Sequence, residues 1–228
     1  MKNIDKIAVI HYTKLKNRKS HMLKELKEWL PNIEYEFVED FDQEVLTEDV
    51  INQNFDLDTF ENKFKRKMLI SEMSLCMKYK KIVKEISNCK GGEYFLILED
   101  DVIFKEDPIK YISSMNKLCN DHNIKYDCVF LGEAWIRKGD NRDIFGKKDH
   151  PATNGLCTVL YTKDSLKKLN NYLQSTKITQ PLDWEFNTAF EQMDFQVYWG
   201  KALTKHGSVL AIDEDSLKHL KSSLRDSY

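Results

Sequence analysis

Apolar and polar positions form two recurring patterns along the chain. Short runs dense in β-branched residues predict buried strands, and apolar residues three and four positions apart predict amphipathic helices. Lys6–Tyr12 (KIAVIHY) predicts a first strand. Ser20–Leu30 has helical spacing and stops at Pro31, and Tyr35–Val38 predicts a second strand. The order strand, helix, strand is typical of an α/β fold with a parallel sheet.

The same patterns continue through the rest of the chain. Helices are predicted at Ser71–Ile86, from Pro108 onward, at Asp164–Leu173, at Pro181–Met193 and at Asp213–Leu224. Strands are predicted from Tyr94 to the acids at 99–101, at Asp127–Leu131, at Gly155–Tyr161 and at Phe195–Trp199. Asp42–Phe64 predicts a loop with short helical pieces, and Trp135–Ala152 a long loop. Without repeats or a low-complexity linker, the pattern favours a single domain.

Composition narrows the class of protein. The 35 basic and 37 acidic residues give a formal charge of −2, which argues against a nucleic-acid partner. The 5 cysteines form no C-x-x-C pair, which indicates reduced thiols in a cytosol-like compartment. The first apolar run is too short for a signal peptide or a membrane span. We therefore expect a cytoplasmic protein without a transmembrane segment.

One stretch of the sequence contains adjacent acidic residues that could bind a cation. In YFLILEDDVIF a core strand ends directly in Glu99, Asp100 and Asp101. Two carboxylates about 4 Å apart repel by about 4 kcal/mol at an effective dielectric near 20. Water, basic side chains, protonation or a bound cation can offset that repulsion. Ligands of open α/β sheets bind at the carboxyl ends of strands, and oxygen-rich clusters there suit Mg²⁺ or Mn²⁺. A solvated acidic loop is the alternative for this motif taken alone.

Several blocks, in this order, resemble glycosyltransferase family 25, which covers lipopolysaccharide-type and collagen galactosyltransferases. The blocks span nearly the whole chain: IAVIHYTKLKNRKSHM, SEMSLCMKYKKIVKEI, YFLILEDDVIF, YDCVFLGE, TNGLCTVLYTKDSLKKL, PLDWEFN and VYWGKALTKHGSV. YFLILEDDVIF is close to the family's L-E-D-D signature, and PLDW is similar to its P-x-D-W segment.

The resemblance implies a GT-A-like, Rossmann-type fold with a mixed, mostly parallel sheet flanked by helices. It also implies one glycosyltransferase domain over residues 1–228. Residues up to about 104 would bind the nucleotide sugar, and those from about 105 onward the acceptor. The donor would be a UDP-sugar and the cofactor Mn²⁺ or Mg²⁺, which neutralises charge on the leaving diphosphate.

Site residues follow from the family motifs. The resemblance assigns the metal to Glu99, Asp101 and His206, although a lone histidine can also be structural. It assigns the nucleotide sugar to five residues: His11, Tyr12, Arg18, Glu72 and Asp100. The planar fork of Arg18 suits a diphosphate, with a solvated arginine as the alternative.

Acceptor chemistry is assigned to the second half of the chain. Asp183 is the predicted catalytic base of an inverting transfer, with a helix N-cap as the alternative role. Trp184 would stack on an acceptor sugar or fill the core. Glu133 is a second candidate base or acceptor contact.

We therefore predict transfer of a hexose, galactose or glucose, from a UDP-sugar to a hydroxyl on a glycan or protein. The family's Gly-Glu-x-Gly-Cys-x-x-Ser-His block appears here as SEMSLCMKY, which keeps Glu72 but lacks the glycines and the Ser-His pair. That departure motivates an alternative, a relative that binds nucleotide sugar or glycan without turnover. A metal-dependent nuclease or phosphotransferase fits less well, since no second carboxylate cluster or Gly-rich phosphate loop is present.

Overall fold

The computed structural model describes residues 4–132, 145–147 and 155–206, with the His206 side chain left out. The elements, in chain order, are β1 (Lys6–Ile10), α1 (Lys16–Trp29), β2 (Glu34–Val38), α2 (Glu48–Asn54), α3 (Leu57–Phe64), α4 (Ile70–Asn88), β3 (Tyr94–Glu99), β4 (Val102–Phe104), α5 (Pro108–Asp121), β5 (Cys128–Gly132), β6 (Gly146–Lys147), β7 (Thr158–Thr162), α6 (Lys163–Ser175), α7 (Leu182–Gln192) and β8 (Val197–His206).

All eight strands belong to one sheet, in the order β2-β1-β3-β7-β5-β8-β4, with β6 paired to β8. Parallel pairing joins β2, β1 and β3 and also joins β5 to β8, while the other pairs are antiparallel. The predicted α/β class with a mixed sheet is therefore confirmed. Because β7 lies between β3 and β5, one sheet runs through both predicted halves of the chain.

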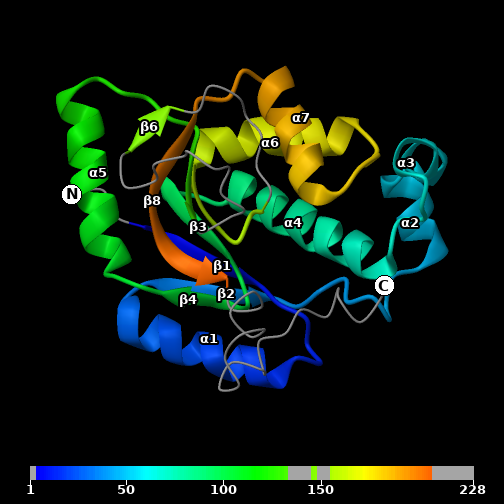
Figure 1. Ribbon diagram of the computed structural model, residues 1–228, viewed down its shortest axis with the longest axis horizontal. Coiled ribbons are helices and arrows are strands. Elements are labelled where there is room, and N and C mark those ends of the chain that lie inside the picture. Colours follow the sequence, from blue (N-terminus) through cyan, green and yellow to red (C-terminus); the bar gives the residue numbers. More distant parts are fainter. Residues whose placement is uncertain (1–3, 133–144, 148–154, 207–228) are drawn as a thin grey trace.

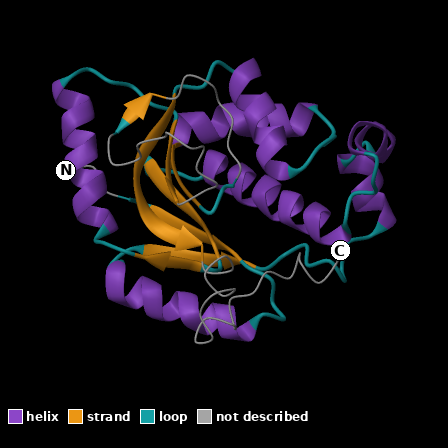
Figure 2. Cartoon of the chain, in the orientation of Figure 1, coloured by secondary structure: helices purple, strands orange, loops and turns teal. Residues whose placement is uncertain are grey.

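Helices cover both faces of the sheet, as Figures 1 and 2 show. Alternate residues of a strand point to opposite faces. Ile7 and Val9 enter the core beneath α1 and α5, whereas Ala8 and Ile10 enter the core beneath α4, α6 and α7. The result is a three-layer arrangement whose central strands are buried on both sides, as their continuous apolar sequences predict.

Local signals set several helix starts. Asp107 accepts a hydrogen bond of 3.0 Å from the Lys110 N–H, and Pro108 occupies the first turn of α5. The Thr162 hydroxyl caps α6 in the same way, at 3.2 Å from the Ser165 N–H. The predicted loop at 42–64 contains the short helices α2 and α3, as expected.

Other boundaries differ from the sequence prediction. Helix α1 begins at Lys16, four positions before the predicted Ser20, in a polar stretch where side-chain periodicity carries no signal. Strand β8 continues to His206, beyond the predicted end at Trp199, because its second part pairs with β4. The predicted tail helix Asp213–Leu224 lies outside the described residues, as does most of the predicted loop Trp135–Ala152.

Two further predictions concern the cysteines and the membrane. All five cysteines are free thiols, and four of them are buried. Within the described ranges, none of the helices has the length and apolar content that crossing a bilayer would need.

Candidate active site

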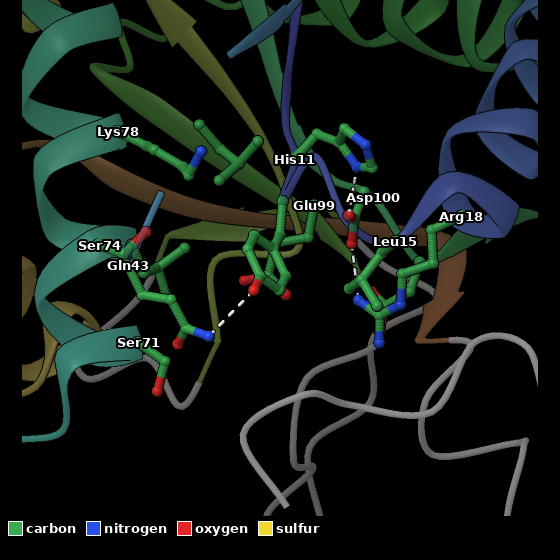
Figure 3. A pocket seen from close by; sticks show the side chains of 13 residues that line it. His11, Leu15, Arg18, Gln43, Ser71, Ser74, Lys78, Glu99 and Asp100 are labelled. Carbon is green, nitrogen blue, oxygen red and sulfur yellow. Dashed lines mark hydrogen bonds and ion pairs between the residues drawn. The ribbon is translucent and has the colours of Figure 1, made fainter. Parts of the chain in front are cut away.

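A pocket opens where β1 and β3 end side by side. These strands are parallel, and Ile10 is the register partner of Glu99, so the loops that follow them meet at one edge of the sheet. The first half of α4 forms the opposite wall (Figure 3). The lining residues are Ile10, His11, Tyr12, Leu15, Arg18, Gln43, Ser71, Ser74, Leu75, Lys78, Glu99, Asp100 and Asp101. The structure thus brings together four of the five predicted nucleotide-sugar residues and two of the three predicted metal ligands.

Asp100 is the hub of a buried polar cluster in this pocket. Its Oδ2 lies 2.7 Å from Nδ1 of His11, and its Oδ1 accepts a hydrogen bond of 2.6 Å from Nη1 of Arg18 (Figure 3). All three side chains are buried. Burial alone would raise the pKa of Asp100, but the hydrogen bond from His11 and the charge of Arg18 outweigh it and lower that pKa. Both carboxylate oxygens of Asp100 therefore have partners within the protein.

Arg18 offsets part of the electrostatic repulsion among the acids. Its Nη2 also lies 3.5 Å from Oδ2 of Asp101, so one guanidinium faces two adjacent carboxylates. Burial acts to lower the pKa of Arg18, yet the charges of Asp101 and Asp100 raise it. A basic side chain thus offsets repulsion at Asp100 and Asp101, and the solvated-arginine alternative does not hold.

Asp183 lies in the first turn of α7, where the charge of Glu99 at the end of β3 acts on it, although it is not among the residues that line the pocket. Burial raises its pKa to about 6, and the charges of Glu99 and Glu72 act in the same direction. The N-cap position of α7 is Pro181, and Asp183 Oδ1 accepts a hydrogen bond of 3.1 Å from the next backbone N–H, that of Trp184. Asp183 is therefore not the N-cap that the alternative assigned to it.

Glu72 has a structural role at the start of α4. Its Oε2 accepts a hydrogen bond of 2.8 Å from the Leu69 N–H, and Arg66 binds both carboxylate oxygens, at 2.6 and 2.7 Å. The neighbouring Ser71 and Ser74 line the pocket, whereas Glu72 does not. Its contact with a nucleotide sugar stays a prediction.

For the remaining predicted site residues the structure gives fewer contacts. The Trp184 side chain is 48% exposed, and its ring packs edge-on against Phe64 with a centroid distance of 5.6 Å. It is thus partly available to a ligand. The backbone of His206 pairs with Val102, directly after Asp101, while its side chain is not described. Glu133 lies outside the described residues.

Sequence reasoning missed a second buried polar cluster at the pocket wall. Nζ of Lys78 lies 2.6 Å from Oδ1 of Asp42, and Oδ2 of Asp42 accepts a hydrogen bond of 3.2 Å from the Thr13 N–H. Lys78 and Asp42 are both buried. The available signal was a lysine on the apolar face of a predicted helix, between Met77 and Tyr79, where a charge needs a partner.

The pocket offers oxygen ligands of the type that divalent cations prefer. Among the residues that the structure describes, no three His, Cys, Asp or Glu side chains are already grouped as a cation site. Glu99 and Asp101 nevertheless both line the pocket, and the strand end bearing His206 pairs beside them. The described part of the pocket therefore supplies two carboxylates, Glu99 and Asp101, of the kind that Mn²⁺ or Mg²⁺ binds.

Comparison with known proteins gives a family match and several structural similarities. A family model described as glycosyltransferase family 25 (LPS biosynthesis protein) matches residues 4–148. No curated protein matches the chain.

Three solved structures resemble the chain at low identity. A197 from STIV has 14% identity and a TM-score of 0.42, over 87% of this chain and 83% of that one. A glycosyltransferase involved in glycosylation of the major capsid of PBCV-1 has 11% identity and a TM-score of 0.42, over 95% and 98% of the two chains. Drosophila β1,4-galactosyltransferase 7, solved with manganese, UDP-Gal and xylobiose, has 12% identity and a TM-score of 0.40, over 89% and 71%.

Proposed function

The chain belongs to glycosyltransferase family 25, and we propose that it transfers a hexose, galactose or glucose, from a UDP-sugar to a hydroxyl acceptor on a glycan or protein, with inversion. The observation that carries this proposal is the pocket at the ends of β1 and β3. It combines the fixed cation Arg18 with the carboxylates of Glu99 and Asp101.

The donor end of the pocket suits a diphosphate. Arg18 lines the pocket beside Asp100, and a guanidinium is the group whose planar N–H donors pair with phosphate oxygens. His11 and Tyr12 line the same wall, and Gln43 donates a hydrogen bond of 3.0 Å to the Tyr12 hydroxyl. These side chains would bind and orient the nucleotide half of the donor.

The acids would hold the divalent cation. Glu99 and Asp101, with His206, are the proposed ligands of Mn²⁺ or Mg²⁺, which when bound neutralises charge that grows on the leaving diphosphate. Asp100 takes a different part in this proposal, because its oxygens are committed to His11 and Arg18. It would keep the phosphate-facing side chains in place.

Asp183 would act as the general base. The acceptor oxygen forms a bond to the anomeric carbon as the bond from that carbon to the diphosphate breaks, and the hydroxyl proton passes to the Asp183 carboxylate. A base with a pKa of about 6 is ionised at neutral pH and still basic enough to take a proton. The half-exposed ring of Trp184, next in the chain, would stack on an apolar face of the acceptor sugar.

Release of UDP from a panel of UDP-sugars, with Mn²⁺ and with chelator, tests the proposal. We expect release that selects one sugar, needs the cation and disappears in Asp101→Ala. Asp183→Asn should still bind UDP but lose transfer. Asp164→Ala, a carboxylate removed from the surface of α6, serves as the matched control and should behave as wild type.

Two results would contradict the proposal in different ways. Cation-dependent UDP binding without turnover, across a panel of hydroxyl acceptors, would favour a relative that binds nucleotide sugar without catalysis. The replacement of the family's Ser-His pair by Lys78-Tyr79 is the observation behind that second candidate. Absence of any UDP binding would overturn the assignment of the pocket.

A further inference from the structure

A groove runs along α4, behind the wall of the pocket. We call it the α4 groove; its lining residues are Asp40, Phe41, Asn54, Met77, Lys80, Lys81, Lys84, Glu85, Asn88, Cys89 and Gln174. Helices α4 and α6 pack side by side (Figure 1). From Met77 to Asn88 the helix rises by about 16 Å. The groove is therefore long enough for a chain-like ligand.

The lysines of this groove are unequally neutralised. Lys81 forms ion pairs with Asp40 at 3.2 Å and with Glu85 at 2.7 Å. Across the described ranges, neither Lys80 nor Lys84 has an ion pair with a carboxylate. One turn of helix apart, these two ammonium groups face the same groove.

Lys80 is partly buried and Lys84 is exposed, so two like charges on one helical turn are unfavourable chiefly at Lys80 unless an anion lies between them. Burial and the charge of Lys84 both lower the pKa of Lys80, which is the signature of a cation without a counter-charge. A carboxylate or phosphate placed between the two ammonium groups would reverse both effects. Lysines pair with such anions as point charges and accept several orientations.

The other side chains of the groove suit hydroxyl groups. The amide N–H of Asn54 donates to the Val50 carbonyl at 2.8 Å, and that of Asn88 donates to the Lys84 carbonyl at 2.9 Å. These bonds fix each amide so that its oxygen is left as an acceptor. Gln174 adds a third amide across the groove. These amide oxygens can accept hydrogen bonds from the hydroxyl groups of a ligand, and the ammonium groups of Lys80 and Lys84 can bind its negative charge.

We propose that the α4 groove is a second binding site, which takes an anionic sugar unit bearing a carboxylate or a phosphate. The loop that follows β2 lies between the groove and the pocket. Asp40 and Phe41 of this loop line the groove, whereas Gln43 lines the pocket. The site does not depend on the proposed donor or cation chemistry. On an enzyme that glycosylates charged glycans, it would hold a part of the glycan that does not react.

Titration calorimetry with three probes tests this site. The probes are a hyaluronan tetrasaccharide for carboxylate, glucose 6-phosphate for phosphate and chitotetraose as the neutral sugar. At least one anionic probe should bind wild type with a Kd of about 1 mM or tighter. Lys80→Gln with Lys84→Gln should weaken that binding at least tenfold, and raising the ionic strength should weaken it too. The neutral probe should bind at least tenfold less tightly.

The matched control removes two lysines elsewhere. Lys110→Gln with Lys117→Gln changes the net charge equally, on exposed positions of α5 on the other face of the sheet. It should leave binding of the anionic probe unchanged. Equal binding to the Lys80/Lys84 variant and to wild type, equal binding of the neutral probe, or no binding of either anionic probe would each overturn the proposal. Binding of UDP should persist in the Lys80/Lys84 variant, so failure here is distinct from failure of the proposed transferase function.

Discussion

Arg18 and Asp100 are joined by a hydrogen bond of 2.6 Å across 82 positions of sequence. The bond ties α1 to the end of β3, and His11 ties the end of β1 to the same carboxylate. One of three consecutive acids therefore holds the pocket together, and its two neighbours, Glu99 and Asp101, line the same pocket. Because Arg18 faces both Asp100 and Asp101, its charge helps to explain how an acidic cluster can follow a core strand.

Removing the hub should destabilise the fold. Asp100→Ala leaves Arg18 buried without its main partner, and breaking a buried pair in this way costs about 3–5 kcal/mol. Urea unfolding at pH 7 should show that loss. Asp164→Ala, which breaks the exposed pair with Lys167, should cost no more than about 1 kcal/mol. A similar small cost for both variants would contradict the stabilising role of the cluster.

The same carboxylate should make stability depend on acid pH. Because the pKa of Asp100 is lowered in the folded state, its contribution is fully present above the unfolded value of about 3.9. It is lost as the pH falls through the lower folded value. The difference in free energy of unfolding between wild type and Asp100→Ala should therefore be constant from pH 5 to 7 and shrink below about pH 4. A difference that does not change with pH would show that packing, not charge, accounts for it.

Asp183 should have the opposite effect on how the free energy of unfolding depends on pH. Its folded pKa of about 6 is above the unfolded value of about 3.9, so the folded state favours the protonated form. Stability is then lost as the pH rises from about 4 to 6, by about 3 kcal/mol at most. Asp183→Asn should be more stable than wild type at pH 8 and equal to it at pH 4, by urea unfolding. The same variant should lose transfer, and wild-type kcat/KM should rise with an apparent pKa near 6. Lower stability of the variant at pH 8 would contradict this assignment.

Substitution of Trp184 should affect acceptor binding more than the stability of the fold. Its side chain is 48% exposed, so Trp184→Ala should change the free energy of unfolding by no more than about 1 kcal/mol. If the ring stacks on the acceptor, KM for the acceptor should rise about tenfold, with UDP binding unchanged. Tyr35→Ala, which removes another exposed aromatic ring at the far edge of the sheet, should leave both unchanged. An unchanged acceptor KM in Trp184→Ala would remove the residue from the site.

The sequence predicts the fold well because its signals are local. Short apolar runs mark β1 and β3, and the rule that ligands bind at strand ends brings His11 and Arg18 to the same edge as the acids. Helix α5 follows from Asp107 and Pro108 alone, through capping chemistry. These elements need no knowledge of tertiary contacts.

The roles of individual acids could not be predicted in the same way. Three adjacent carboxylates look alike in a sequence, and which one turns inward depends on Arg18, far away in the chain. Glu72 matches a family position, but its carboxylate is used by Arg66 and by the start of α4. The pairing of Asp42 with Lys78 joins a loop to a helix across 36 positions, and no periodicity records such a contact.

That pairing supports the last prediction, a coupling between Asp42 and Lys78. Lys78→Met leaves the buried carboxylate of Asp42 without its ammonium partner, which should cost about 3–5 kcal/mol. Adding Asp42→Asn removes the stranded charge, so the double variant should be more stable than the sum of the single changes predicts. A double-mutant cycle by urea unfolding should give a coupling energy of about 1.5 kcal/mol or more.

The pair should also act on the pocket. Asp42 holds Thr13, which follows the pocket residues His11 and Tyr12, and Lys78 lines the pocket itself. Loosening this contact should weaken UDP binding in Lys78→Met, and the double variant should not restore it, because the link to Thr13 is weakened as well. Lys81→Met, which breaks the more exposed pairs with Asp40 and Glu85, is the matched control and should change stability by no more than about 1 kcal/mol. Additive single changes with unaltered UDP binding would mean that the pair neither stabilises the fold nor shapes the pocket.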